Sequence, residues 1–349
     1  MDDPRLTNSR RSCFRRCQRE HHFKYNLGYR AIREVPALYF GQMMHRALAA
    51  WWLAPREARL DAAIEQIGKE PGDPFDVARV RALMIGYHAR WADAPYEALA
   101  IEVPFEASLL NPATGFPSKT WRDAGVIDTI IRDTSAAWLR KLICEHKTTS
   151  EDASPGSDYW KRLKLDAQIG AYYQGAKALG HEVEGCLYDV LVKPRERPYE
   201  ATPAASRKYT KDGRLYAAQR ERDETAEEYE RRLIDAISAE PDRFYQRGIV
   251  VRLEEEIRDH AFDSWQIGRQ IREGQLAGRH PRNPDACVRW GRACEFFAVC
   301  CGETRLEDST QFEQLVNVHQ ELPPLRGAQP REEATYAIPA EDSEPAASA

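Results

Sequence analysis

Apolar residues in the first third of the chain recur at the spacing of helix faces. Leu38, Met44 and Leu48 fall on one side of a predicted helix. Helices are predicted over residues 36–53, 56–69 and 74–94, after a short basic helix and an aromatic segment within 6–30. Residues 1–95 are therefore expected to form a helical N-terminal subdomain.

From residue 96 the apolar residues alternate instead, which is the period of a strand with one buried face. Ile101, Val103 and Phe105 share one such face. The predicted elements are strands over 98–109, 121–132, 137–147 and 186–192, with a helix over 159–180 before the last strand. Three consecutive strands favour an antiparallel meander, and a helix before the fourth strand favours a mixed sheet. We therefore expect an α/β core over 96–195.

The rest of the chain is more charged. Two charged helices are predicted over 224–240 and 253–275. Residues 322–349 are rich in Pro, Ala and Glu and offer little to bury, which is typical of a disordered tail. We divide the remainder into a basic insertion with helices (196–280), a cysteine region (281–321) and the tail (322–349).

The composition, with 42% hydrophobic and 30% charged residues, is that of a soluble globular protein. No apolar run is typical of a signal peptide or a membrane span, so we expect a cytoplasmic protein with no membrane contact. The net charge of −5 excludes a chain that coats nucleic acid through its overall charge.

Positive charge is nevertheless concentrated in two segments. Residues 5–33 carry nine Arg and Lys with only Glu20 as an acid, and residues 193–222 carry nine against four acids, with three tyrosines interleaved. Such segments can contact phosphates while the rest of the surface stays acidic. For the second segment, a solvated loop is an equally good interpretation.

Two carboxylates and a lysine lie on two predicted neighbouring strands. Asp128 lies in one, and Glu145 and Lys147 end the next, where the strand period puts both on one face. Paired carboxylates suit Mg²⁺ or Mn²⁺, which prefer oxygen ligands. Such a cation polarises a phosphodiester and activates water, and a lysine can stabilise the developing charge. We interpret the three residues as a site for phosphodiester hydrolysis.

A surface ion pair on an edge strand is the alternative, because Asp followed by Glu-x-Lys is common by chance. Against it, the triplet ends the apolar run Leu142-Ile143-Cys144, where charges are costly unless function requires them. The triplet also leads into a polar loop, which favours an exposed strand end.

Three further residues are candidates for the same site. His45 lies early in an otherwise apolar helix, and its imidazole can ligate a metal such as Mn²⁺; a hydrogen-bonded core histidine is the alternative. Gln168 and Tyr172 are four residues apart on the helix after Lys147 and share a face. They could reach the substrate or the metal-bound water, or simply pack.

The motifs, in order, are Cys17-Gln18-Arg19 before an aromatic run, Gly41-x3-His45, Gly125-Val126-Ile127-Asp128, Glu145-His146-Lys147-Thr148, Gln168-x3-Tyr172 and C-terminal cysteines. This order resembles the RecB-like branch of the PD-(D/E)xK nuclease superfamily over roughly residues 12–301. More narrowly, it is similar to the iron–sulfur exonucleases associated with CRISPR adaptation and their phage relatives. Gln18 departs from the usual Pro, and Glu145 replaces the more frequent Asp.

The resemblance implies a restriction-endonuclease-like core, a mixed sheet flanked by helices, over 96–195. The implied site residues are His45, Asp128, Glu145 and the His146 carbonyl as metal ligands, Lys147 as the catalytic lysine, and Gln168 and Tyr172 as the family's Q-x3-Y motif. Glu102, in the preceding strand, is a weaker candidate for the same site.

Cysteines are concentrated near the two ends of the chain. Cys287-x6-Cys294-x5-Cys300 forms a C-terminal set, and Cys17 is the natural fourth ligand. Four thiolates suit a [4Fe–4S] cluster or a tetrahedral Zn²⁺, and the resemblance favours [4Fe–4S]. The flanking residues Cys13 and Cys301 are substitute ligands, whereas Cys144 and Cys186 lie in apolar strands and are expected to be core residues.

The combined expectation is a Mg²⁺- or Mn²⁺-dependent DNA exonuclease that acts on single-stranded or frayed ends and carries a structural [4Fe–4S] cluster. Partners would include DNA and a helicase, recombination or CRISPR-adaptation protein. One alternative is a weakly active DNA-binding repair or recombination accessory protein. The other is a zinc-stabilised interaction protein. Cleavage polarity and pathway do not follow from the sequence.

Overall fold

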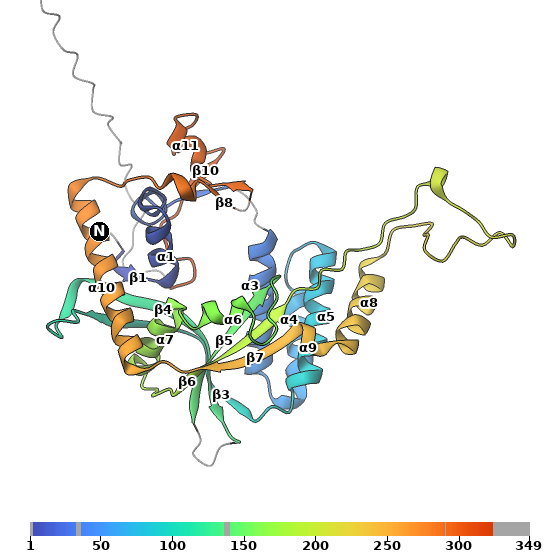
Figure 1. The fold of residues 1–349 in the computed structure, drawn as a ribbon, viewed down its shortest axis with the longest axis horizontal. Helices are drawn as coiled ribbons and strands as arrows, with labels where there is room; N and C mark the ends of the chain where they lie inside the picture. The colour runs from blue at the N-terminus through green and yellow to red at the C-terminus, as the bar shows by residue number, and fades with distance from the viewer. Residues whose placement is uncertain (1–2, 33–35, 136–139, 290, 324–349) are drawn as a thin grey trace, which may run out of the picture.

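The computed structural model describes residues 3–32, 36–135, 140–289 and 291–323. A mixed six-stranded sheet lies at its centre, with helices on both faces (Figure 1). This arrangement confirms the expected α/β fold.

The strands are β1 (Arg5–Leu6), β2 (Tyr29–Ala31), β3 (Tyr96–Leu110), β4 (Pro117–Asp133), β5 (Lys141–Thr149), β6 (Gly185–Val192), β7 (Tyr245–Val250), β8 (Val288–Arg289), β9 (Arg292–Ala293) and β10 (Phe312–Gln314). The helices are α1 (Asn8–Arg16), α2 (Gln18–His21), α3 (Pro36–Leu53), α4 (Arg59–Gly68), α5 (Pro74–Trp91), α6 (Asp158–Leu163), α7 (Ala167–Ala178), α8 (Ala226–Ala239), α9 (Pro241–Phe244), α10 (Glu254–Ala277) and α11 (Phe297–Cys301).

The central sheet has the strand order β1-β4-β5-β6-β7, with β3 also paired to β4. Strands β3, β4 and β5 form the expected antiparallel meander. Strands β5 and β6 run parallel, which requires the crossover that α6 and α7 supply. Strand β7 adds an antiparallel edge and β1 joins β4 in parallel; neither strand was predicted.

Side chains along β5 and β6 point alternately to the two faces of the sheet. Cys144 and Leu187 pack into the core shared with α3, α4, α5 and α8. Ile143 and Cys186 pack into the core on the other face, under α6 and α7. Cys144 and Cys186 are fully buried, as expected for core residues.

The helix predicted over 159–180 is broken into α6 and α7. The Oδ1 atom of Asp166 accepts a hydrogen bond from the backbone N–H of Gln168 at 2.9 Å and caps the start of α7. This cap starts a second helix, so Gln168 lies in the first turn of α7 at the edge of the sheet.

The two ends of the described chain lie together. Strand β2 pairs antiparallel with β10, and α1 packs beside α10 (Figure 1). Leu322 was assigned to the disordered tail, but it is buried; residues 324–349, which make up nearly all of that tail, lie outside the described residues. The part of the predicted third strand before residue 140 also lies largely outside them. Among the described helices, none is long and apolar enough to cross a membrane.

Candidate active site

A chain of hydrogen bonds joins β5 to α7. Lys147 Nζ donates to Glu145 Oε1 at 2.6 Å and to Gln168 Oε1 at 2.6 Å. Gln168 Nε2 then donates to the hydroxyl of Tyr172, also at 2.6 Å. The strand period places Glu145 and Lys147 on one face, as predicted, and α7 covers that face. The helix period puts Gln168 and Tyr172 together opposite them.

Asp128 on β4 lies beside this chain of hydrogen bonds. Its Oδ2 accepts from the backbone N–H of His146 at 2.9 Å and lies 3.5 Å from Nδ1 of His45, on α3. Ligand atoms of His45, Glu102 and Asp128 all lie within 4.8 Å of one another. The structure therefore brings together a histidine and two carboxylates from three separate elements.

Glu102 reaches this cluster from a strained position on β3. Its φ is +47°, and no other non-glycine residue in the described chain has a positive φ. Ile101 pairs with Thr129 and Val103 with Ile127, so Glu102 lies across from Asp128. A non-glycine residue in this conformation costs about 1–2 kcal/mol. Such strain is concentrated at functional sites, where the surrounding structure holds the residue in place.

Burial and neighbouring charges shift the pKa values of the three carboxyl groups at the site. Burial and the charge of Asp128 raise the pKa of Glu145 to about 7, against the opposing effect of Lys147. Burial opposes ionisation of Asp128 as well, but His45 and His146 hold its pKa at about 2. Burial and Asp128 also raise the pKa of Glu102. A divalent cation would favour the ionised form of all three carboxyl groups.

Glu145 provides a direct test of whether a metal fits. Its Oε1 bonds to Lys147, but its buried Oε2 has no hydrogen-bond partner among the described residues. An unpartnered buried carboxylate oxygen is costly unless something compensates it. With His45, Glu102 and Asp128 close by, the donor set of carboxylate oxygens and one imidazole fits Mg²⁺ or Mn²⁺.

The side chain of His146 points to the opposite face of β5. Its Nε2 accepts from the indole N–H of Trp52 at 3.1 Å, so Nδ1 carries the proton and faces Asp189 Oδ2 at 3.3 Å. Asp189 in turn accepts from Tyr87 and Arg247. The imidazole therefore makes its contacts on the far side of β5, and only the backbone of His146 faces Asp128.

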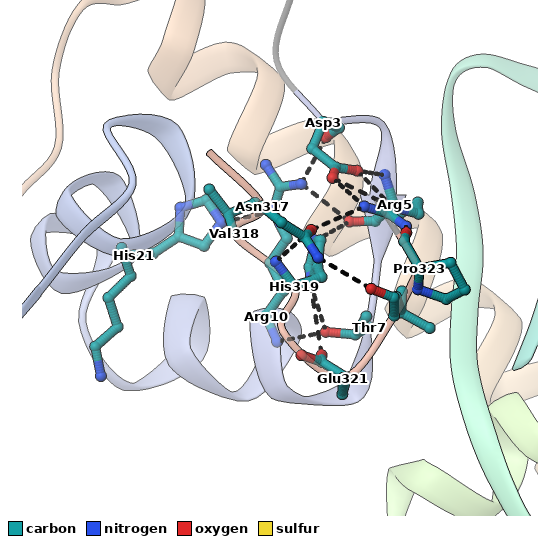
Figure 2. Close-up of polar contacts among 12 residues, drawn as sticks. Asp3, Arg5, Thr7, Arg10, His21, Asn317, Val318, His319, Glu321 and Pro323 are labelled. Atoms are coloured by element: carbon teal, nitrogen blue, oxygen red, sulfur yellow. Dashed lines mark hydrogen bonds and ion pairs between the residues drawn. The ribbon is translucent and has the colours of Figure 1, made fainter. Parts of the chain in front are cut away.

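Of the site residues, His45, Glu102, Asp128, Gln168 and Tyr172 line a cavity of about 730 Å³, whereas Glu145 and Lys147 do not line it. Its other lining residues include Asn8, Ser9, Gln42, Arg46, Pro104, Gly125 and residues 320–323. No pattern in the sequence predicted this C-terminal wall. Figure 2 shows why it is held: Arg5 donates to the carbonyl of Pro323 at 2.6 Å, and His319 Nε2 lies 3.1 Å from the carbonyl oxygen of Arg5. The Asp3 carboxylate accepts a hydrogen bond from the same guanidinium.

A sequence model of the PD-(D/E)XK nuclease superfamily matches residues 5–301. The chain belongs to this superfamily. Its membership agrees with the mixed sheet, and the nucleases of this superfamily depend on a divalent metal. Among solved structures, the chain is similar to one described as the crystal structure of SSO0001, at 12% identity and a TM-score of 0.30, over 76% of this chain and 78% of that chain. No curated protein matches.

The PD-(D/E)XK chain also brings its four predicted cluster cysteines to one place. Cys17, Cys287, Cys294 and Cys300 line a single small cavity between the N-terminal helices and the C-terminal region. Burial raises the pKa of Cys294 to about 11.

The two flanking cysteines do not line this cavity. Cys13 is buried against Tyr25 and Val318, and Cys301 is exposed. The geometry therefore favours the predicted four over either substitute.

Proposed function

We propose that this nuclease is a Mg²⁺- or Mn²⁺-dependent DNA exonuclease that acts on single-stranded or frayed ends. The observation that carries the proposal is the unpartnered Glu145 Oε2 beside the His45–Glu102–Asp128 cluster, with Lys147 hydrogen-bonded next to it.

The ligands would be His45, Asp128 and Glu145, with the His146 carbonyl and Glu102 as additional ligands. When bound, the cation supplies a Lewis acid and a water of lowered pKa. The chain's own residues then position the reaction. Lys147 is held between Glu145 and Gln168 and keeps its charge, because both Glu145 and Asp166 raise its pKa against the effect of burial. That charge can stabilise the phosphate oxygens as negative charge develops.

The shape of the cavity supports action on strand ends. At about 730 Å³ it has the size of a pocket for a small ligand. Walls from α3, α7 and residues 320–323 surround it. We infer that it receives one strand at a time, so an unpaired end enters more easily than an intact duplex.

For the four cysteines we propose a [4Fe–4S] cluster. Its support is that Cys17, Cys287, Cys294 and Cys300 line one small cavity, because four thiolates gathered in one place suit such a cluster. The cluster would join Cys17 to a segment some 270 residues later and so restrict the unfolded chain.

A cleavage assay tests the function. Anaerobically purified protein is mixed with 5′- and 3′-labelled single-stranded and duplex DNA in Mn²⁺, Mg²⁺ or EDTA. We expect stepwise loss of nucleotides from single strands with either metal and none in EDTA. Cleavage that persists in EDTA, or equal cleavage of closed circular DNA, would contradict the proposal.

Metal analysis of the same preparation tests the cluster. We expect about four iron atoms per chain and a broad visible absorbance that is lost on oxidation. One zinc per chain and a colourless protein would reject it. The protein that delivers the strand, whether a helicase, a recombination protein or a CRISPR-adaptation protein, would then be sought by its effect on cleavage.

A further inference from the structure

Residues 193–222 form an arm that projects far from the body of the protein between β6 and α8 (Figure 1). Backbone hydrogen bonds join its two sides. Thr202 N–H donates to the Arg220 carbonyl at 2.8 Å, and nearer the tip Tyr216 N–H donates to the Lys208 carbonyl at 3.1 Å. Tyr209 and Leu215 form an antiparallel bridge next to the turn. The arm is therefore a narrow hairpin that is paired at these points and contains no regular strand among its described residues, and it is called the ribbon from here on.

The base of the ribbon is fixed to α8. Glu224 receives two hydrogen bonds from the Arg232 guanidinium, at 2.8 and 2.7 Å. The ring of Tyr199 lies 4.4 Å from the Arg220 guanidinium and 3.9 Å from that of Arg232. The hydroxyl of Tyr229 donates to the Glu196 carbonyl at 2.7 Å. These contacts set the direction in which the ribbon leaves the body.

The ribbon begins beside the catalytic edge of the sheet. Lys193 N–H donates to the Thr149 carbonyl at 2.7 Å, and the Arg195 guanidinium donates to the Ser150 carbonyl at 2.7 Å. Thr149 lies two residues after Lys147 on the same strand. A substrate held in the active site would therefore pass close to the base of the ribbon.

The tip of the ribbon carries positive charge that the protein does not neutralise. Lys208, Lys211 and Arg214 are exposed, and none forms an ion pair within the described chain, where Asp212 is the one acid between residues 201 and 220. Tyr209 and Tyr216 are about half exposed, at 50% and 49%. Cations interleaved with exposed aromatic rings are typical of a nucleic-acid surface.

We propose that this ribbon enters the major groove of duplex DNA that flanks the strand being cleaved. This inference rests on the proposed function. The major groove of B-DNA admits a two-stranded ribbon, whereas that of A-form RNA is too deep and narrow. The ribbon can span at most about 60 Å from Arg195 to its turn, at about 3.4 Å per residue. That length exceeds one helical turn of DNA, about 34 Å.

The test measures binding, not cleavage, in the Lys147→Ala background without divalent metal. Two variants are compared. One combines Lys208→Gln, Lys211→Gln and Arg214→Gln; the other replaces residues 203–219 by Asn-Gly, which closes a two-residue turn near the paired Thr202 and Arg220. The matched control removes three charges elsewhere, with Lys69→Gln, Lys119→Gln and Arg272→Gln at exposed positions, one just after the end of α4, one in β4 and one in α10.

The probe is a 20-base-pair DNA duplex with a short single-stranded end, titrated over a range of salt concentrations. Both arm variants should bind on the order of ten-fold or more weakly, and the slope of log affinity against log salt should flatten by about 2–3, or about 0.9 per lost phosphate contact. The control and the parent should keep the same slope. With an A-form RNA duplex, the arm variants and the parent should bind alike.

Unchanged affinity and slope on the DNA duplex would overturn the proposal. So would an equal loss on the RNA duplex, which would show a non-specific charge effect. Absence of cleavage in the wild-type assay would contradict the proposed function, but these binding results would remain interpretable. Thermal unfolding of each variant confirms that its body is folded.

Discussion

Asp189 lies behind the active site, and its replacement should be among the most destabilising changes in this nuclease. Its carboxylate accepts from Arg247 Nε at 3.1 Å, from Arg247 Nη2 at 2.9 Å and from the Tyr87 hydroxyl at 2.6 Å. Its side chain is 1% exposed, and that of Arg247 is 8% exposed. Asp189→Ala would leave a buried guanidinium without its counter-charge, and His146 would lose the group that orients its Nδ1.

The expected loss is about 3–5 kcal/mol, the usual cost of leaving one member of a buried ion pair alone. Tyr87→Phe is the matched control, because it removes two hydrogen bonds, one donated to Asp189 and one accepted from Arg247, but no charge, and should cost about 1–2 kcal/mol. The free energies of unfolding would be measured by urea denaturation at neutral pH, where Asp189, whose pKa is lowered by Arg247 and His146 against the effect of burial, stays ionised.

The double variant Asp189→Leu/Arg247→Met then separates charge from packing. If the cost comes from the orphaned cation, the double variant should be more stable than Asp189→Ala, because neither charge remains buried. The reasoning is refuted if Asp189→Ala loses no more stability than Tyr87→Phe. It is also refuted if the double variant loses as much stability as Asp189→Leu and Arg247→Met lose in sum.

Three further changes have defined outcomes. Glu102→Gly removes the strain of φ +47° and should stabilise the fold by about 1 kcal/mol in urea denaturation while it weakens Mn²⁺ binding; a loss of stability would contradict the strain. Gly175→Ala places a Cβ 2.6 Å from the Phe105 ring and should cost about 1–3 kcal/mol, and an unchanged melting temperature would show that the ring moves freely. His260 stays neutral in the fold because burial, with Arg11, Arg15 and Arg252, lowers its pKa to about 3. Stability should therefore fall below pH 6.5, by about 1–2 kcal/mol at pH 5, and His260→Gln should lose less; parallel pH curves would argue against it.

Much of the active site was predictable because strand alternation is a local property. The two-residue period alone places Glu145 and Lys147 on one face and the His146 ring on the other. The expectation that Ile101, Val103 and Phe105 share one face was wrong, because Ile101 packs in the core under α3 and α5, whereas Val103 and Phe105 pack in the core under α6 and α7. The change of face falls at Glu102, whose positive φ leaves no mark in the sequence.

Features that depend on one particular contact were not predictable. The break between α6 and α7 depends on one Asp166 cap that competes with a continuous apolar pattern. The C-terminal wall depends on Arg5 meeting Pro323, more than 300 residues away. Strand β1 has two residues, too few to show a period. In each case a single hydrogen-bonding partner, not a pattern, decides the structure.

The most direct test of the central claim is cleavage by Lys147→Ala in Mn²⁺, with Mn²⁺ binding measured on the same protein. The variant should lose cleavage of end-labelled single-stranded DNA by about 10²–10³-fold, the usual effect of removing a group that stabilises developing charge. It should still bind Mn²⁺, because the proposed ligands His45, Asp128 and Glu145 remain. Cleavage at the wild-type rate by a folded Lys147→Ala protein would contradict the assignment of this site.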